Sequence, residues 1–287
     1  MPKLGIFNIE INGIKTKYAT FGKGKNLIIL PAWRMDIDRS EELIKYIGVK
    51  FRVFYLNVPG YGNRNNLKKY YTVEDYSRFI CSWIKKLDLD KFSIFGISMG
   101  GPIAYNLLNR IDEKKVDKVI FLAPWYNSDC LNFNPKLFKL GEKLIKVAST
   151  KKLSKIGDKI FDNKKLLMGY MRLITPKENF KDKENMIKYV KNFRTFSFTT
   201  TMYSLYNVLK YDLNEKTKKH NHKTIFVMSK NDPQISYDKT LKGYKRLFPN
   251  IIEFPLEHKF HAPRIWITKK LISQYFGKTF IEAMQII

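Results

Sequence analysis

The sequence contains little of what marks a secreted or membrane protein. It has two cysteines, Cys81 and Cys130, in 287 residues, too few for a disulfide framework. No apolar run approaches the roughly 18 residues needed to span a membrane. The first residues, Met1 to Gly5, lack the apolar segment of a signal peptide. We therefore expect a soluble cytoplasmic protein without a membrane span.

Histidine is also scarce, and the four histidines do not form a pattern typical of a metal site. His220 and His222 stand in a basic segment without thiolate or carboxylate companions. Glu257, His258 and His261 do not spell the H-E-x-x-H zinc motif. The sequence predicts no metal site and no cofactor.

Acidic residues are few, 26 against 53 Lys and Arg, which leaves a net charge of +27. Such a surface attracts nucleic acid, anionic lipid or an acidic carrier protein. The alternative is the codon bias of an AT-rich genome, because Lys, Asn and Ile are all abundant. No basic block stands alone, so we expect no specific nucleic-acid binding.

The most informative stretch is a G-x-S-x-G motif, Gly96 to Gly100, with Ser98 at its centre. A short apolar segment precedes it and suits a buried strand, and apolar residues at helical spacing follow it. A serine on so sharp a strand-to-helix turn has its hydroxyl exposed above the sheet edge, and the N–H of Met99 points at a developing oxyanion. The motif predicts Ser98 as a nucleophile; the alternative is that Ser98 only caps the helix.

At these residues the sequence resembles the α/β-hydrolase superfamily, and the likeness extends over nearly the whole chain. The resemblance implies an α/β fold, with a mostly parallel central sheet flanked by helices and a helical cap inserted into it. It also implies a serine, an acid and a histidine in that order along the chain.

The family's acid usually lies in the loop that corresponds to Lys230-Asn-Asp-Pro-Gln234, after an apolar strand at residues 223–229. The resemblance therefore assigns the acid to Asp232, whose task is to hold the tautomer of the histidine. Two alternatives are open. Asp232 could be a turn residue before a proline, and Asp129, after an earlier strand, could be the acid instead.

The family's base lies directly after the last strand, here residues 250–256. His261 begins a His-Ala-Pro segment similar to one in bacterial carboxylesterases of the pimeloyl-acyl-carrier-protein methyl ester type. Its separation from Asp232 also suits the family better than that of His258. His261 is therefore the predicted base, and His258 is the alternative.

The oxyanion hole is expected from the backbone N–H groups of Met99 and Trp33. The family usually has His-Gly in the loop before Trp33, where this chain has Pro31 and Ala32. A backbone N–H needs no particular side chain, so the departure is tolerable. The alternative is that Trp33 simply covers the core.

The alternation of strands and helices stops between residues 127 and 218, where the pattern is helical and rich in aromatics. The resemblance implies a helical cap here, over a hydrolase core made of residues 1–126 and 219–287. Aromatic side chains that face down from the cap, with Trp125 below, would form an apolar substrate pocket.

These residues together predict a serine hydrolase that cleaves an ester, or a related acyl bond, of a small apolar molecule. The resemblance to the pimeloyl-type esterases adds an acidic carrier protein as a partner. Other chemistry on the same fold stays open: a perhydrolase, a lyase or a carbon–carbon bond hydrolase. So do a non-catalytic ligand receptor and a protein that binds anionic surfaces.

Local signals predict three further features. Asn12-Gly13, between alternating segments, predicts a β-hairpin. A capping box is predicted at residues Asp38 to Glu41, where it opens a helix, and residues Thr72 to Asp75 are predicted to cap another.

Overall fold

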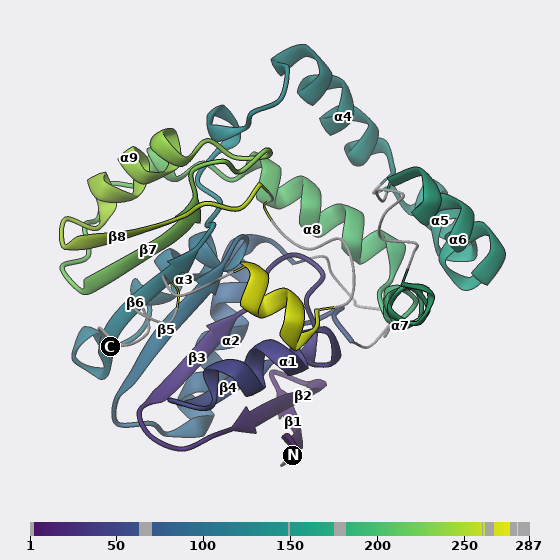
Figure 1. Cartoon of the computed structure of the whole chain (residues 1–287). Helices are drawn as coiled ribbons and strands as arrows, with labels where there is room; N and C mark the ends of the chain where they lie inside the picture. Colours follow the sequence, from purple (N-terminus) through teal and green to yellow (C-terminus); the bar gives the residue numbers. More distant parts are fainter. Residues whose placement is uncertain are drawn as a thin grey trace.

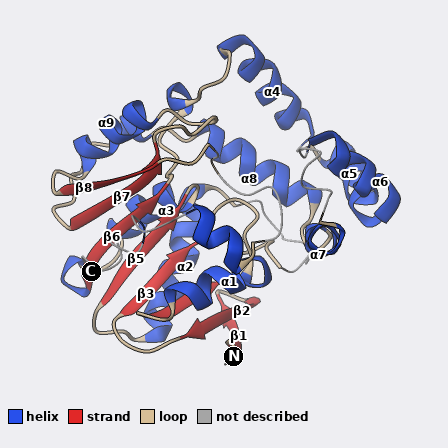
Figure 2. Cartoon of the chain, viewed as in Figure 1, coloured by secondary structure: helices blue, strands red, loops and turns tan. Residues whose placement is uncertain are grey.

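The computed structural model describes residues 3–62, 71–148, 150–174, 182–259, 261, 267–275 and 280. Its centre is one eight-stranded sheet in the order β1-β2-β4-β3-β5-β6-β7-β8. Helices cover both faces of this sheet (Figure 1, Figure 2). The predicted fold class is confirmed.

The strands divide into an antiparallel edge and a parallel body. β1 (Gly5–Ile11) and β2 (Ile14–Phe21) form the predicted hairpin, and β2 pairs antiparallel with the next strand in the sheet. From there to the far edge all neighbours are parallel: β4 (Arg52–Leu56), β3 (Asn26–Leu30), β5 (Phe92–Ile97), β6 (Val116–Leu122), β7 (Lys223–Ser229) and β8 (Ile251–Leu256). The central strands are almost entirely apolar because helices bury both of their faces.

Two apolar cores lie on opposite faces of the sheet. One is covered by α2 (Val73–Leu87), α3 (Gly100–Leu108) and α9 (Tyr237–Leu247). The other is covered by α1 (Ile37–Ile47) and by the helical residues 269–275. The carboxyl ends of the parallel strands are therefore free to carry a site at one edge of the sheet.

The capping box predicted at Asp38 is wrong, and the helix cap predicted at Thr72 is confirmed. α1 is capped by Asp36, whose Oδ1 accepts a hydrogen bond of 3.0 Å from the N–H of Arg39. Asp38 is exposed and lies within the first turn. The helix begins two residues earlier than predicted because Asp36, also a good capping residue, is buried there and bonded on several sides.

Five α-helices of the described residues, here named the cap helices, lie between β6 and β7 in the chain and gather at the carboxyl ends of the strands (Figure 1). They are α4 (Pro135–Ala148), α5 (Lys151–Asp162), α6 (Lys164–Ile174), α7 (Lys183–Phe193) and α8 (Phe198–Lys210). α5 to α7 share a small apolar cluster of their own around Phe161 and Phe193. None of the helices in the described ranges is long and apolar enough to cross a membrane.

Candidate active site

The turn at Ser98 joins the end of β5 to the start of α3. Ser98 has a φ of 49°, in the left-handed region that non-glycine residues rarely adopt. Backbone hydrogen bonds hold it there: its N–H donates to the carbonyl of Leu122 at 2.9 Å, and its carbonyl accepts from Gly101 at 2.9 Å and Trp125 at 3.0 Å. The sheet and the next loop therefore fix the strained serine.

Two glycines make room for this turn. A Cβ on Gly96 would lie 2.6 Å from the carbonyl oxygen of Gly100, and a Cβ on Gly100 would collide with the carbonyl oxygen of Leu30. Real Cβ atoms essentially never come so close to a backbone oxygen. The glycines of the motif thus allow α3 to start against the ends of β5 and β3.

Three side chains from the ends of three strands form a hydrogen-bonded line. Ser98 Oγ lies 3.2 Å from Nε2 of His261, and Nδ1 of His261 lies 2.8 Å from Oδ2 of Asp232. The residues follow β5, β8 and β7 respectively. A line of this kind can pass a proton from the hydroxyl to the imidazole and leave a nucleophilic oxygen.

The environment of Asp232 suits a carboxylate that orients an imidazole. Burial alone would raise the pKa of Asp232, but the hydrogen bond and charge of His261 lower it, as do the N–H groups of Gln234 and Ile235. Those N–H groups donate to Oδ1 at 2.8 and 3.1 Å. The net pKa is lowered, so Asp232 stays ionised and its other oxygen faces His261.

The two alternative residues lie elsewhere. His258 lines the same cavity as His261, but its ring packs against Tyr275, with 5.8 Å between the centroids. Asp129 is exposed, and its carbonyl accepts a hydrogen bond from Lys239. Of the predicted candidates, the structure brings together Ser98, His261 and Asp232. Ala262 and Pro263, which carried the resemblance at His261, lie outside the described residues.

Met99 and Trp33 are the two residues predicted to form the oxyanion hole. Met99 directly precedes α3, and Trp33 stands in the turn after β3; both line the cavity that contains Ser98. Within the described ranges, neither backbone N–H donates to another residue. The indole of Trp33 donates to the carbonyl of Thr201 in α8 at 3.1 Å, which ties this turn to the helices above.

The cavity has a volume of about 560 Å³ and extends from Ser98 up between the sheet and the cap helices. Its wall is mostly apolar and includes Trp125, Leu122, Met202 and Leu205. Trp125 is held by a hydrogen bond of 3.1 Å from its indole to the carbonyl of Tyr211. No group of three or more potential metal ligands occurs in the part of the chain that the structure describes.

A family model described as the alpha/beta hydrolase fold matches residues 25–264. The chain belongs to this family. The match spans β3 to the segment that carries His261. This α/β hydrolase therefore has its candidate site at the sheet edge where its family's fold presents loops.

Individual relatives of this α/β hydrolase bear names of different activities. A Mycoplasma pneumoniae protein named esterase/lipase 3 is 32% identical over 75 residues, which cover 26% of this chain and 28% of that protein. The chain aligns with less than half of the length of the curated relatives it matches. These alignments leave the activity of the whole protein to be inferred from the site.

Solved structures match over far more of the chain. A bromoperoxidase from Bacillus anthracis has a TM-score of 0.71 at 15% identity, over 98% of this chain and 99% of that one. The epoxide hydrolase CorEH has a TM-score of 0.69 at 15% identity, over 96% and 99%. At such identities the likeness concerns the fold alone.

Sequence reasoning missed two arginines in the cavity wall of the hydrolase, Arg34 and Arg39. Both side chains are buried, with exposed fractions of 4% and 8%. The available signal was a basic residue directly after Trp33 in an otherwise apolar turn, Pro31 to Met35.

Proposed function

We propose that this protein hydrolyses carboxylic esters of small, largely apolar molecules through an acyl-enzyme on Ser98. The observation that carries the proposal is the hydrogen-bonded line of Ser98, His261 and Asp232 at the floor of an apolar cavity. The hydrolase family and the esterase/lipase names among the relatives support it.

The reaction begins when Ser98 Oγ attacks the carbonyl carbon of the ester and His261 Nε2 takes the hydroxyl proton. The carbonyl oxygen becomes an oxyanion, which accepts hydrogen bonds from the N–H groups of Met99 and Trp33. His261 then gives its proton to the leaving alcohol. Water attacks the acyl-enzyme by the same route, which releases the acid and restores Ser98.

Asp232 acts on the histidine and not on the substrate. Its carboxylate fixes the proton on Nδ1 of His261, so that Nε2 faces Ser98 as an acceptor. It also stabilises the imidazolium that forms once the proton has moved. The acidic carrier partner, the cytoplasmic location and the resemblance to pimeloyl-type esterases stay predictions of the sequence.

The test is to label the protein with a fluorophosphonate and to measure turnover of short p-nitrophenyl esters by the wild type and by Ser98→Ala. We expect labelling of the wild type alone and a loss of kcat/KM of at least about 10³-fold in the variant. Circular dichroism should show that the variant keeps its fold.

Ser93→Ala is the matched control, because Ser93 lies in β5 five positions earlier, is buried, and its Oγ has no partner among the described residues. It should label and turn over as the wild type does. Ester turnover by Ser98→Ala within about tenfold of the wild type would contradict the proposal. Assays with hydrogen peroxide as acyl acceptor would separate a perhydrolase from an esterase.

A further inference from the structure

Arg34 places a buried positive charge in the wall of the cavity. Its side chain is 4% exposed and lines the same cavity as Ser98. Its Nε has no hydrogen-bond partner, and no carboxylate pairs with it, in the described part of the chain. A buried charge in this state is costly unless a ligand supplies the counter-ion.

Aromatic rings hold the guanidinium of Arg34 in place. Its Cζ lies 3.0 Å from the ring centroid of Phe193, 5.0 Å from that of Phe196 and 5.7 Å from that of Trp33. Cation–π contacts of this kind compensate for part of the hydration free energy that the guanidinium loses on burial. They leave the in-plane N–H of Nε without an acceptor among the described residues, and a carboxylate provides acceptors in that plane.

The neighbourhood of Arg34 adds positive charge. Nη1 of Arg39 donates to the carbonyl of Arg34 at 3.2 Å, and its guanidinium lies 5.0 Å from the ring centroid of Tyr189. Burial lowers the pKa of Arg34 to about 9, Tyr189 counteracts this and Arg39 adds to it. Arg34 is therefore still a cation at neutral pH.

The carboxylate next in the chain, Asp36, already has other partners. It accepts hydrogen bonds from Asn192 at 2.9 and 2.8 Å, and from the N–H of Arg39 at 3.0 Å. These bonds hold it at the start of α1. Asp36 is therefore not the partner of Arg34, and among the described residues the guanidinium is left open to a bound anion.

We propose that Arg34 binds a carboxylate on the substrate, at the end of the molecule remote from the scissile ester. The inference rests on the proposed function. It narrows the substrate class to half-esters of dicarboxylic acids and to esters of similar shape. The apolar wall takes the carbon chain, and Arg34 takes its charged end. Arg34 directly follows Trp33 in the chain and lines the same cavity as Ser98, so a short dicarboxylic half-ester is the first substrate to test.

Binding is tested without turnover, in the Ser98→Ala background, by calorimetry. The two ligands are monomethyl glutarate and its neutral amide isostere, methyl 4-carbamoylbutanoate. We expect the anion to bind about 10- to 100-fold more tightly than the amide, as a charge-assisted bidentate bond requires. This comparison needs no change at Arg34, so it holds even if variants there fold poorly.

When Arg34→Met is added to Ser98→Ala, the dissociation constants of the two ligands should differ by no more than about threefold. Arg34→Lys should keep part of the preference for the anion. Arg52→Met is the matched control. Arg52 also stacks on a ring, with Cζ 5.1 Å from the centroid of Phe54, but it is exposed and does not line the cavity. Equal binding of both ligands before any change at Arg34, or a preference unaltered by Arg34→Met, would overturn the inference.

Turnover separates this inference from the proposed function. Suppose that wild type hydrolyses both esters with equal kcat/KM and that Arg34→Met leaves the ratio of the two values unchanged. The esterase activity is then supported and the role of Arg34 is contradicted. If the half-ester binds through Arg34 but is not hydrolysed, the carboxylate site is supported and the proposed esterase activity is contradicted. We expect the ratio of kcat/KM for half-ester over amide to fall about 10- to 100-fold in Arg34→Met, mainly through KM.

Discussion

At the scale of single residues, the site depends on a serine in an unfavourable backbone conformation. A non-glycine residue in the left-handed region costs on the order of 1 kcal/mol or more. Hydrogen bonds from and to Leu122, Gly101 and Trp125 compensate for this cost in the turn at Ser98. The hydroxyl is thus presented to His261 by the sheet itself, and not by a loop that could adopt several conformations.

The choice between the two histidines gives a prediction at this scale. His261→Ala should lower kcat/KM about as far as Ser98→Ala, because the variant lacks the imidazole that is hydrogen-bonded to Ser98 Oγ. His258→Ala should cost less than about tenfold, since its ring packs on Tyr275. The measurement is steady-state kinetics on one neutral ester with all three variants.

Asp232→Asn belongs in the same series and should lower kcat by about 10³- to 10⁴-fold, because an amide favours the wrong tautomer of His261. A severe loss in His258→Ala beside a mild one in His261→Ala would reverse the assignment of the base. If Asp232→Asn lowered kcat only mildly and Asp129→Asn lowered it severely, the acid would be assigned to Asp129.

The sequence predicts some of these residues and not others for a physical reason. Ser98, Asp232 and His261 each follow an apolar strand, and a local motif with a known chain order points to them. Arg34 is one of 53 basic residues. Its importance comes from burial against Phe193, a ring 159 positions away, and no local pattern records that contact.

At the scale of elements, Asp36 joins α1 of the core to α7 of the cap. It caps α1 through the N–H of Arg39, and it accepts both hydrogen bonds from Asn192 near the end of α7. The sequence predicted the helix but not its first residue, because Asp36 and Asp38 are equally good caps by type. The contact with the cap decides between them.

Asp36 should make stability depend on pH in a specific direction. Burial, as the largest cause, raises its pKa above the usual value, so the folded chain binds this proton more tightly than the unfolded chain. The contribution of Asp36 to stability therefore falls as pH rises from the usual Asp pKa through the folded pKa. Urea unfolding should show wild type losing stability relative to Asp36→Asn over that range.

Asp38→Asn is the comparison, because Asp38 is exposed in the first turn of the same helix and its charge contributes to the raised pKa of Asp36. Asp38→Asn should therefore lose less stability than wild type, relative to Asp36→Asn, as pH rises over that range. Asp36→Ala should lose about 2–4 kcal/mol, from the missing cap and the unpaired amide of Asn192. A wild type that gains stability over Asp36→Asn as pH rises would mean that the pKa of Asp36 is lowered, contrary to expectation.

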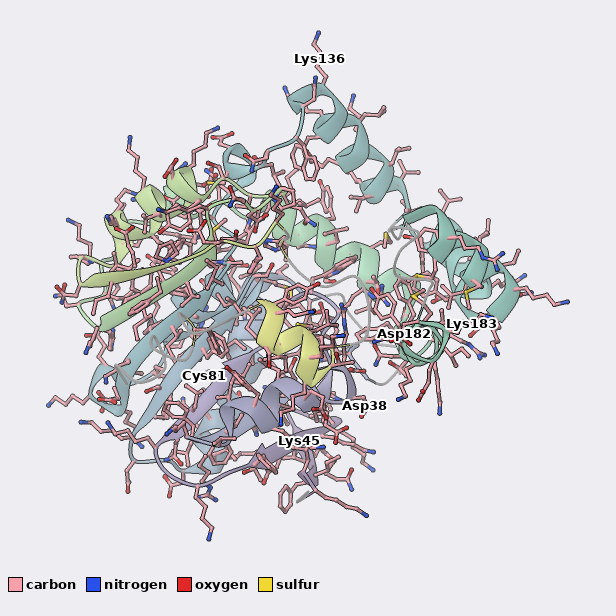
Figure 3. The ribbon with its side chains drawn as sticks, in the orientation of Figure 1. Asp38, Lys45, Cys81, Lys136, Asp182 and Lys183 are labelled. Carbon is pink, nitrogen blue, oxygen red and sulfur yellow. The ribbon has the colours of Figure 1, made fainter. Side chains whose placement is uncertain are left out.

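At the scale of the whole molecule, the outer cap helices α4 to α6 are packed less completely than the strands of the sheet. Exposed fractions reach 63% at Leu144 in α4 and 55% at Ile156 in α5. Lys136 at the start of α4 points away from the body (Figure 3). The strands β5 to β7 are instead buried on both faces.

Hydrogen exchange measured by mass spectrometry should reflect this contrast. Amides of α4 to α6 should exchange through local opening at a free energy well below that of global unfolding, and those of β5 to β7 near the global value. Amides of α8 should exchange at an intermediate free energy. The indole of Trp33 donates to Thr201 in α8, and that of Trp125 donates to Tyr211 directly after it. Equal protection of α4 and β6 would show that the cap and sheet unfold as one unit.

The distance along the chain between Ser98 and His261 also determines when the site can form. The two residues are 163 positions apart, and a ribosome adds about 5–20 residues per second, so roughly 8 to 30 seconds separate their synthesis. During that interval the nascent chain contains Ser98 but not yet His261. A chain that stops before β8 would keep most of the sheet and its arginine-lined wall, yet would lack a base for its serine.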